Sequence, residues 1–176
     1  RRVLPCPAVI PINRIAISTG GGDAPGLNAV IRSAVLAARN RGWDIVGIRD
    51  GFNGLMFPDE YADGGLINLS RESVRGISHL GGTIIGSTNK GNPTAFPTQQ
   101  DDGTWVEVDR THELLERFKE AGIDALVTVG GDGSLSIGNH LFQHGLRVVG
   151  VPKTIDNDLD KTHVTFGFDT AVDFAT

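Results

Sequence analysis

The sequence has 176 residues, 16 Lys plus Arg against 21 Asp plus Glu, a formal charge of −5 and 39% hydrophobic residues. This length and apolar content predict one compact globular domain and exclude a disordered chain. Apolar runs fall far short of the roughly 18 residues of a membrane span, and no Lys/Arg block offers a surface to nucleic acid or anionic lipid. We therefore expect neither a membrane nor a nucleic acid as partner. The single cysteine, Cys6, excludes an intrachain disulfide framework and favours a cytoplasmic location.

The first third of the chain reads as an arm followed by strand, glycine turn and helix. Three prolines in the first fourteen residues oppose a regular helix, so residues 1–14 are expected to form an N-terminal arm. Apolar periodicity then predicts a strand over Arg14–Ser18, a turn over Gly20–Gly26 and a helix over Leu27–Arg39. A second short strand is predicted over Asp44–Ile48.

The middle third is richer in turns. A turn over Asp50–Gly54 precedes a helix predicted over Arg71–Leu80, with Ser70 as its N-cap. A strand is expected over Thr83–Ser87, followed by a polar loop over residues 89–103. That loop is too long for a simple connector, and such loops often bind a ligand.

The last third repeats the alternation of strand and helix. The predicted elements are a helix over Thr111–Ala121, a strand over Ala125–Val129, a loop over Gly130–Gly133, a helix over Ser134–His144, a strand over Arg147–Val151 and a loop over Pro152–Asp158. Asp169–Thr176 reads as the start of a helix without a stop signal, so we expect the chain to be truncated.

This alternation predicts an α/β fold, a Rossmann-like, mainly parallel sheet with helices on both faces. In such folds the ligand crevice lies at the carboxyl ends of the strands. Glycine is abundant, with 24 residues, and its clusters follow predicted strands together with polar residues. We therefore expect the three loops that follow the strands to meet at one end of the sheet.

The loop Gly20–Gly26 has the form of a phosphate site, because a glycine loop that enters a helix presents backbone N–H groups and the positive end of the helix dipole. It is not a Walker loop, since no Gly-Lys-Ser/Thr follows, and it lacks the Gly-x-Gly-x-x-Gly spacing of dinucleotide folds. A tight turn that uses glycine only for positive φ is the alternative.

Asp132 stands in the second glycine loop, where a carboxylate beside phosphates calls for a divalent cation. Mg²⁺ accepts one or two carboxylates together with phosphate oxygens and waters. The alternative is that Asp132 caps the helix that follows.

The segment Lys153–Asp158 places an ammonium, a hydroxyl and two further carboxylates within six residues. An aspartate can take a proton from an attacking alcohol, and a lysine can neutralise charge on a transferring phosphoryl group. Turn chemistry of Asn157 and Asp158 alone is the alternative.

Taken together, the motifs resemble the ATP/pyrophosphate-dependent 6-phosphofructokinase family. The segments that carry the resemblance are Gly20-Gly-Gly-Asp-Ala-Pro-Gly-Leu-Asn28, Gly81-Gly-Thr-Ile-Ile-Gly-Ser87, Gly130-Gly-Asp-Gly-Ser134 and Pro152-Lys-Thr-Ile-Asp-Asn-Asp158. The resemblance implies the N-terminal half of the phosphofructokinase fold and transfer of a phosphoryl group from ATP–Mg²⁺ to the 1-hydroxyl of fructose 6-phosphate, giving fructose 1,6-bisphosphate in glycolysis.

The resemblance also implies roles for individual residues. Gly21, Gly131, Gly133 and Ser134 would hold the donor phosphates, with Asp132 as the Mg²⁺ ligand. In the last motif, Asp156 would be the general base that also meets the sugar, Thr154 would contact the sugar phosphate, and Lys153 and Asp158 would assist the transfer.

Two departures from the family pattern bear on the donor. Asn89-Lys90 stands where many bacterial ATP users have Arg-Phe, so Lys90 would replace a guanidinium on the transferred phosphate. Lys153 resembles the pyrophosphate users, whereas Gly133 resembles the ATP users, because a side chain at 133 would crowd the nucleotide. We weight Gly133 more heavily and expect ATP, with pyrophosphate as the alternative.

Family members are roughly twice this length, so residues 15–176 are expected to form the donor-binding domain without the second, sugar-phosphate domain. This portion alone is therefore expected not to phosphorylate fructose 6-phosphate at a useful rate, and a non-catalytic nucleotide-binding module is a second hypothesis. A kinase of the NAD or diacylglycerol type shares Gly-Gly-Asp-Gly but is not expected to carry Pro-Lys-Thr-Ile-Asp-Asn-Asp. The resemblance further implies a homo-oligomer, a dimer or tetramer.

Overall fold

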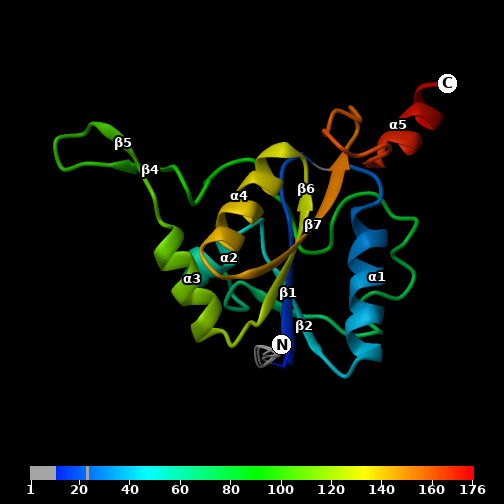
Figure 1. Cartoon of the computed structure of the whole chain (residues 1–176), viewed down its shortest axis with the longest axis horizontal. Helices are drawn as coiled ribbons and strands as arrows, with labels where there is room; N and C mark the ends of the chain where they lie inside the picture. Colours follow the sequence, from blue (N-terminus) through cyan, green and yellow to red (C-terminus); the bar gives the residue numbers. More distant parts are fainter. Residues whose placement is uncertain (1–10, 23) are drawn as a thin grey trace, which may run out of the picture.

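A computed structural model describes residues 11–22 and 24–176, in which a six-stranded sheet has the strand order β3-β2-β1-β6-β7-β8 (Figure 1). The strands are β1 (Arg14–Thr19), β2 (Asp44–Ile48), β3 (Leu66–Asn68), β6 (Ala125–Gly130), β7 (Arg147–Thr154) and β8 (Phe166–Gly167). Neighbouring strands are parallel except β2 and β3. The helices are α1 (Leu27–Asn40), α2 (Asn53–Met56), α3 (Thr111–Glu120), α4 (Asp132–Gln143), α5 (Phe168–Ala175) and the 3₁₀ turn η1 (Pro58–Glu60).

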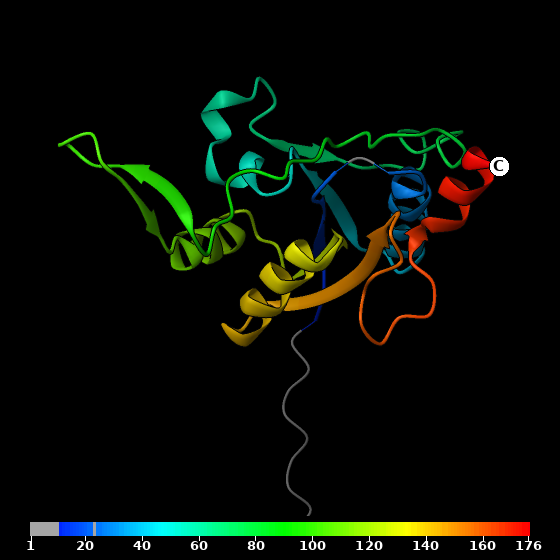
Figure 2. The ribbon, with the colours of Figure 1, turned by 90° about the horizontal axis from the view of Figure 1, so that it is seen from above.

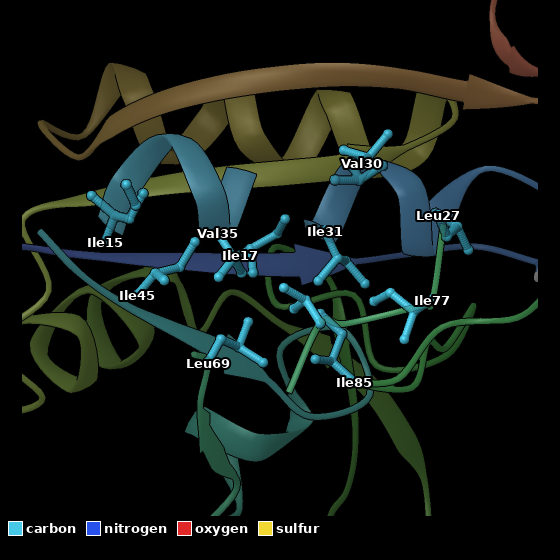
Figure 3. Packing of buried hydrophobic residues seen from close by; sticks show 13 residues of the cluster. Ile15, Ile17, Leu27, Val30, Ile31, Val35, Ile45, Leu69, Ile77 and Ile85 are labelled. Atoms are coloured by element: carbon cyan, nitrogen blue, oxygen red, sulfur yellow. The ribbon is translucent and has the colours of Figure 1, made fainter. Parts of the chain in front are cut away.

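Helices cover both faces of the sheet, as the α/β interpretation predicts. Successive side chains of a strand point to opposite faces. Ile15 and Ile17 of β1 pack in one core cluster with Ile31 of α1 (Figure 3). Ala16, between them, belongs to a second cluster with Phe118 of α3 and residues of α4. The sheet therefore separates two apolar cores, and α1 lies opposite α3 and α4 (Figures 1 and 2).

The helix predicted over Arg71–Leu80 is wrong, because this segment consists of turns. Gly76 has φ +76°, which breaks a helix, and the segment is held instead by the buried side chains of Val74 and Ile77. Ser70 caps only a local turn, in which its Oγ accepts the backbone N–H of Ser73 at 3.2 Å and its own N–H donates to Ser73 Oγ at 2.8 Å.

The strand predicted over Thr83–Ser87 is also wrong. Its apolar residue Ile85 is fully buried against Gly47 of β2, where a Cβ would overlap the Ile85 side chain. Gly86 has φ +77°, so the backbone turns away after one residue, and only Thr88 forms an isolated bridge, with Gly20. This short apolar run is therefore a buried irregular segment rather than a strand.

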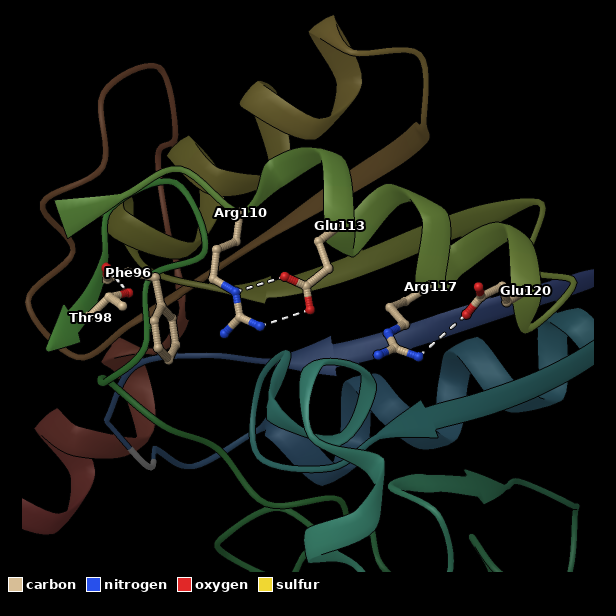
Figure 4. A network of polar contacts seen from close by, with 6 residues as sticks. All are labelled: Phe96, Thr98, Arg110, Glu113, Arg117 and Glu120. Atoms are coloured by element: carbon tan, nitrogen blue, oxygen red, sulfur yellow. Dashed lines mark hydrogen bonds and ion pairs between the residues drawn. The ribbon is translucent and has the colours of Figure 1, made fainter. Parts of the chain in front are cut away.

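The polar loop expected over residues 89–103 contains half of a hairpin, β4 (Phe96–Gln99) paired antiparallel with β5 (Trp105–Val108). The hairpin projects from the body of the molecule (Figures 1 and 2). Its base is held by Arg110, whose guanidinium lies 4.8 Å from the ring centre of Phe96 and donates to Glu113 at 2.8 and 2.7 Å (Figure 4).

Two boundaries matter for the site. The helix predicted to begin at Ser134 begins at Asp132, and the strand predicted to end at Val151 continues to Thr154. Of the arm expected over residues 1–14, residues 1–10 lie outside the described residues, and Arg14 already belongs to β1. Among the described helices, none combines the length and apolar character that crossing a membrane would require.

Candidate functional site

The centre of the sheet contains a topological switch point. From β1 the chain crosses through α1 to β2 on one side, and from β6 it crosses through α4 to β7 on the other. In parallel sheets the ligand crevice opens at the carboxyl ends of such neighbouring strands. A cavity of about 330 Å³ lies there. It is lined by Ser18, Gly20, Gly21, Gly51, Phe52, Thr88, Asn89, Lys90, Gly91, Asn92, Pro93, Thr128, Gly131, Asp132, Gly133, Ser134 and Ile137.

Seven of the predicted site residues line this cavity, which we call the donor pocket: Gly21, Asn89, Lys90, Gly131, Asp132, Gly133 and Ser134. Close packing of glycines brings them together. A Cβ at Gly20 would overlap Ser134 Oγ, and a Cβ at Gly130 would lie 2.9 Å from Gly20 O. The ends of β1 and β6 and the first turn of α4 therefore pack closely only because two of these residues are glycine.

The N-terminus of α4 faces the donor pocket. Gly131 occupies the cap position without a side-chain cap, so the alternative that Asp132 caps this helix is wrong. Asp132 is the first helical residue, and its carboxylate makes no hydrogen bond or ion pair with the described residues. Unpaired backbone N–H groups at a helix start and the helix dipole attract anions, so this end of the pocket suits phosphate.

The first glycine loop contributes differently from expectation. Gly20 and Gly21 line the donor pocket, and Gly21 has φ +81° and donates its N–H to Thr88 O at 3.0 Å. Gly26, which precedes α1, lies instead in a second depression beside Phe166. The helix dipole at the pocket thus belongs to α4 rather than α1, and positive φ is a second reason for glycine in this loop.

The segment Thr88–Lys90 forms the opposite wall. Thr88 Oγ1 accepts a hydrogen bond from the backbone N–H of Lys90 at 3.0 Å, which folds Asn89 and Lys90 along the rim. Within the described residues, Lys90 is the only lysine or arginine that lines the pocket. It therefore brings a positive charge to the rim of the pocket.

The residues predicted in the last motif lie beside the donor pocket rather than in its lining. Lys153 is buried, 4% exposed, and its Nζ donates to Gly22 O at 2.5 Å, which ties β7 to the loop after β1. Thr154 ends β7, and its Oγ1 accepts the backbone N–H of Asp156 at 3.2 Å. Asp156 and Asp158 are exposed on the loop that follows.

Asn157 has the turn role that the sequence left open. It adopts φ +52°, donates from Nδ2 to His163 O at 3.2 Å and accepts the N–H of Thr165 at 3.0 Å. The carboxylates of Asp156 and Asp158 make no such bonds with the described residues, so turn chemistry does not account for them.

Sequence reasoning missed the apolar wall of the pocket, formed by Phe52, Pro93 and Ile137. Phe52 follows β2, which pairs with β1, so the turn after a predicted strand was the available signal. Pro93 and Ile137 carry no local signal, because only the tertiary fold brings them to the pocket.

The metal-ligating side chains present fit a Mg²⁺ ion that is held jointly by the protein and by a bound phosphate ligand. Among the described residues, no group of three or more His, Cys, Asp or Glu side chains converges on a metal position. Asp132 offers a single carboxylate in the first turn of α4, and Mg²⁺ characteristically combines one or two carboxylates with phosphate oxygens.

Comparison with known proteins agrees with this geometry. The family model described as Phosphofructokinase matches residues 14–176. The chain is 46% identical to ATP-dependent 6-phosphofructokinase 2 of Clostridium perfringens and 47% identical to ATP-dependent 6-phosphofructokinase 1 of Synechocystis, in each case over 94% of this chain and 44% of the relative. It therefore spans less than half the length of these relatives.

A solved structure supports the same assignment. The T-state phosphofructokinase of Pichia pastoris superposes with a TM-score of 0.73 at 30% identity, covering 92% of this chain and 17% of that one. With a family match over nearly all of its residues and a shared fold, the chain belongs to the phosphofructokinase family.

Proposed function

We propose that the protein transfers a phosphoryl group from ATP–Mg²⁺ to the 1-hydroxyl of fructose 6-phosphate. The observation that carries this proposal is the donor pocket, in which two glycine loops and the start of α4 surround one cavity at the switch point. The resemblance of the chain to phosphofructokinases supports fructose 6-phosphate as the acceptor.

The donor phosphates are assigned to Gly21, Gly131, Gly133 and Ser134, whose backbone can approach an anion closely. Asp132 would hold Mg²⁺, which when bound neutralises the phosphates during transfer. Asn89 and Lys90 would meet the phosphate being transferred from the opposite wall.

The acceptor side is assigned to the loop after β7. Asp156 would take the proton of the attacking hydroxyl and also orient the sugar, while Thr154 would contact its phosphate. Asp158 would assist beside the base. Lys153, held at Gly22 O, would set positive charge between the donor loop and the base.

The open space at Gly133 favours ATP over pyrophosphate as the donor. No atom lies within 4 Å of a Cβ built at this position, so glycine is not required there by protein packing. Its absence of a side chain instead leaves room for a donor longer than two phosphates. Lys153 can attract the phosphates of either donor, so we give it less weight.

The test is product formation by the purified full-length protein, because residues 15–176 alone are expected to lack useful turnover. With ATP, Mg²⁺ and fructose 6-phosphate, phosphorus NMR should show fructose 1,6-bisphosphate and ADP in equal amounts. Binding of ATP–Mg²⁺ without a phosphorylated sugar would support the non-catalytic module instead. Turnover with pyrophosphate but not ATP would support the alternative donor.

We infer in addition that the enzyme acts as a cytoplasmic homo-oligomer. The resemblance to phosphofructokinases supports self-association, and the single cysteine agrees with a reducing compartment. Sedimentation analysis of the purified protein tests the first statement, and cell fractionation tests the second.

A further inference from the structure

The turn Asp50–Phe52 supplies one wall of the donor pocket. Gly51 and Phe52 both line the cavity, and both are buried. Gly51 lies so near the facing wall that a Cβ on it would be 3.1 Å from Thr88 Cγ2. This turn therefore packs directly against the Thr88 segment of the pocket wall.

The turn is held in an unusual backbone conformation. Asp50 has φ +47°, the left-handed region that non-glycine residues rarely adopt. Its N–H donates to Ile85 O at 3.1 Å, and its carbonyl accepts the N–H of Asn53 at 3.2 Å. A Cβ at Gly86 would overlap the Asp50 carboxylate, so the facing segment is shaped to admit that side chain.

Tyr61 completes this arrangement from outside the pocket. Its hydroxyl donates to Asp50 Oδ2 at 3.0 Å. Partial burial, together with the acceptor carboxylate beside it, raises the pKa of Tyr61 to about 12. The phenol is therefore a neutral donor throughout the physiological range.

The neighbouring ion pair provides a natural contrast. Arg49 donates to Asp63 Oδ2 at 2.9 and 2.6 Å on the same stretch of chain, yet neither residue lines the pocket. Loss of that pair would perturb the segment locally without removing the Asp50 contact.

We propose that Asp50 and Tyr61 are positioning residues for the nucleoside part of the phosphoryl donor. With the phosphates at the start of α4, the remainder of a nucleotide meets the wall that contains Phe52, and the Tyr61–Asp50 hydrogen bond holds that wall in place. A donor without a nucleoside does not reach the wall. The inference rests on the proposed use of ATP and goes beyond it by assigning two residues that do not touch the phosphates.

Three substitutions distinguish this positioning role from a general disturbance of the fold. Tyr61→Phe removes only the donor hydroxyl, and Asp50→Gly removes the acceptor while tolerating the positive φ. Each should weaken Mg-ADP binding about three- to tenfold, the effect of one net hydrogen bond. Asp50→Asn keeps an acceptor and also tolerates this φ, so it should recover most of the affinity.

Calorimetric titration with Mg-ADP and with Mg-pyrophosphate provides the readout. Pyrophosphate affinity should be unchanged in every variant, and Tyr61→Phe combined with Asp50→Gly should be no weaker for Mg-ADP than either alone. Asp63→Asn is the matched control and should bind both probes as the native protein does. In steady-state assays with ATP, the variants should raise KM far more than they lower kcat.

A further readout is spectroscopic, because Tyr61 is the single tyrosine of the sequence. Its ultraviolet titration midpoint should fall in Asp50→Asn, since the neighbouring negative charge is gone. Equal loss of Mg-ADP and Mg-pyrophosphate affinity, additive effects in the double variant, or native Mg-ADP affinity in Tyr61→Phe would each overturn the inference. Failure of the native protein to bind Mg-ADP would instead contradict the proposed function.

Discussion

The Asn28 side chain of α1 accepts a hydrogen bond from the backbone N–H of Ile84 at 2.9 Å. Its Nδ2 donates to Leu80 O at 3.2 Å and Gly81 O at 3.1 Å, and the residue is 2% exposed. One buried amide thus joins the first glycine motif to the irregular segment that leads to Thr88 in the pocket wall.

Asn28→Ala should destabilise the protein by about 1–3 kcal/mol, because it leaves buried backbone groups without partners. The midpoint of urea unfolding measures this loss. Ser33→Ala, on the same helix, removes only an exposed bond to Ala29 O and should change stability by less than about 0.5 kcal/mol. Equal midpoints for the two variants would contradict the role given to Asn28.

Asp156→Asn should lower kcat about 10²- to 10⁴-fold, because the amide keeps the shape of the side chain but cannot accept the proton. Affinity for Mg-ADP should barely change, since Asp156 does not line the donor pocket. Turnover at saturating concentrations of both substrates is the measurement. The matched control is Asp160→Asn, an exposed aspartate of the same loop, which should retain native turnover. Near-native kcat in Asp156→Asn would remove the base assignment.

Gly133→Asp should depress kcat/KM for ATP far more than for pyrophosphate. The substitution meets no protein atom within 4 Å, so its effect falls on the bound donor through volume and like charge. Gly133→Ala adds a methyl group without charge and should reduce ATP use less, with stability preserved in the helix. If the native protein already uses pyrophosphate better than ATP, the weight given to Gly133 over Lys153 is wrong.

Asp124 should contribute to acid sensitivity. Its Oδ2 accepts the backbone N–H groups of Asn13 at 2.7 Å and Arg14 at 2.9 Å, and these bonds hold the pKa of Asp124 below the ordinary value of 3.8. Because the folded pKa is depressed, the stabilisation is complete well above pH 3.8 and is lost as the pH falls through the folded value.

Urea unfolding of the native protein and Asp124→Asn between pH 7 and about pH 2.5 measures this effect. The two stability curves should lie apart at neutral pH and converge below pH 3.8. Asp59→Asn, an exposed aspartate, is the control and should follow the native curve throughout. A constant gap between native protein and Asp124→Asn at all pH values would show that the carboxylate charge is not responsible.

The parts of the fold that the sequence predicts well are those that local chemistry specifies. β1, β2 and β6 are short, mainly apolar segments followed by glycine or a turn, and the boundary of β2 matches its expected residues. α1 has an apolar stripe over its whole length, with Gly26 before it. The apolar periodicity and the glycine or turn residues at the ends are together sufficient to predict such elements.

Segments held by distant contacts escape this reasoning. Residues 71–88 have the composition of a helix and a strand, but their turns are fixed by Asn28 and by Thr19, whose Oγ1 donates to Gly86 O at 2.6 Å. The hairpin pairs only four residues on each strand, and most of its side chains are exposed, so its alternation carries little signal.

The residues of the candidate site likewise fall into those that a local motif predicts and those that only tertiary contacts bring to the pocket. Gly21 and Asp132, which both line the donor pocket, can be predicted because each lies within a local glycine motif. Phe52 cannot, because its place in the pocket depends on the pairing of β2 with β1, and Tyr61 acts through a side chain eleven residues away.

The register between β6 and β7 fixes where the residues at the carboxyl ends of these strands lie. Gly130 pairs with Pro152, and the next residue of β7, Lys153, stays in the sheet, where it pairs with Phe166 of β8. Deleting one residue from Arg147–Val151 would turn the Lys153 ammonium from Gly22 to the opposite face of the sheet, whereas the same deletion in an exposed loop would be absorbed. The register of β7 against β6 therefore places the Lys153 ammonium on Gly22 as well as holding the sheet together, whereas β4 and β5 pair only with each other.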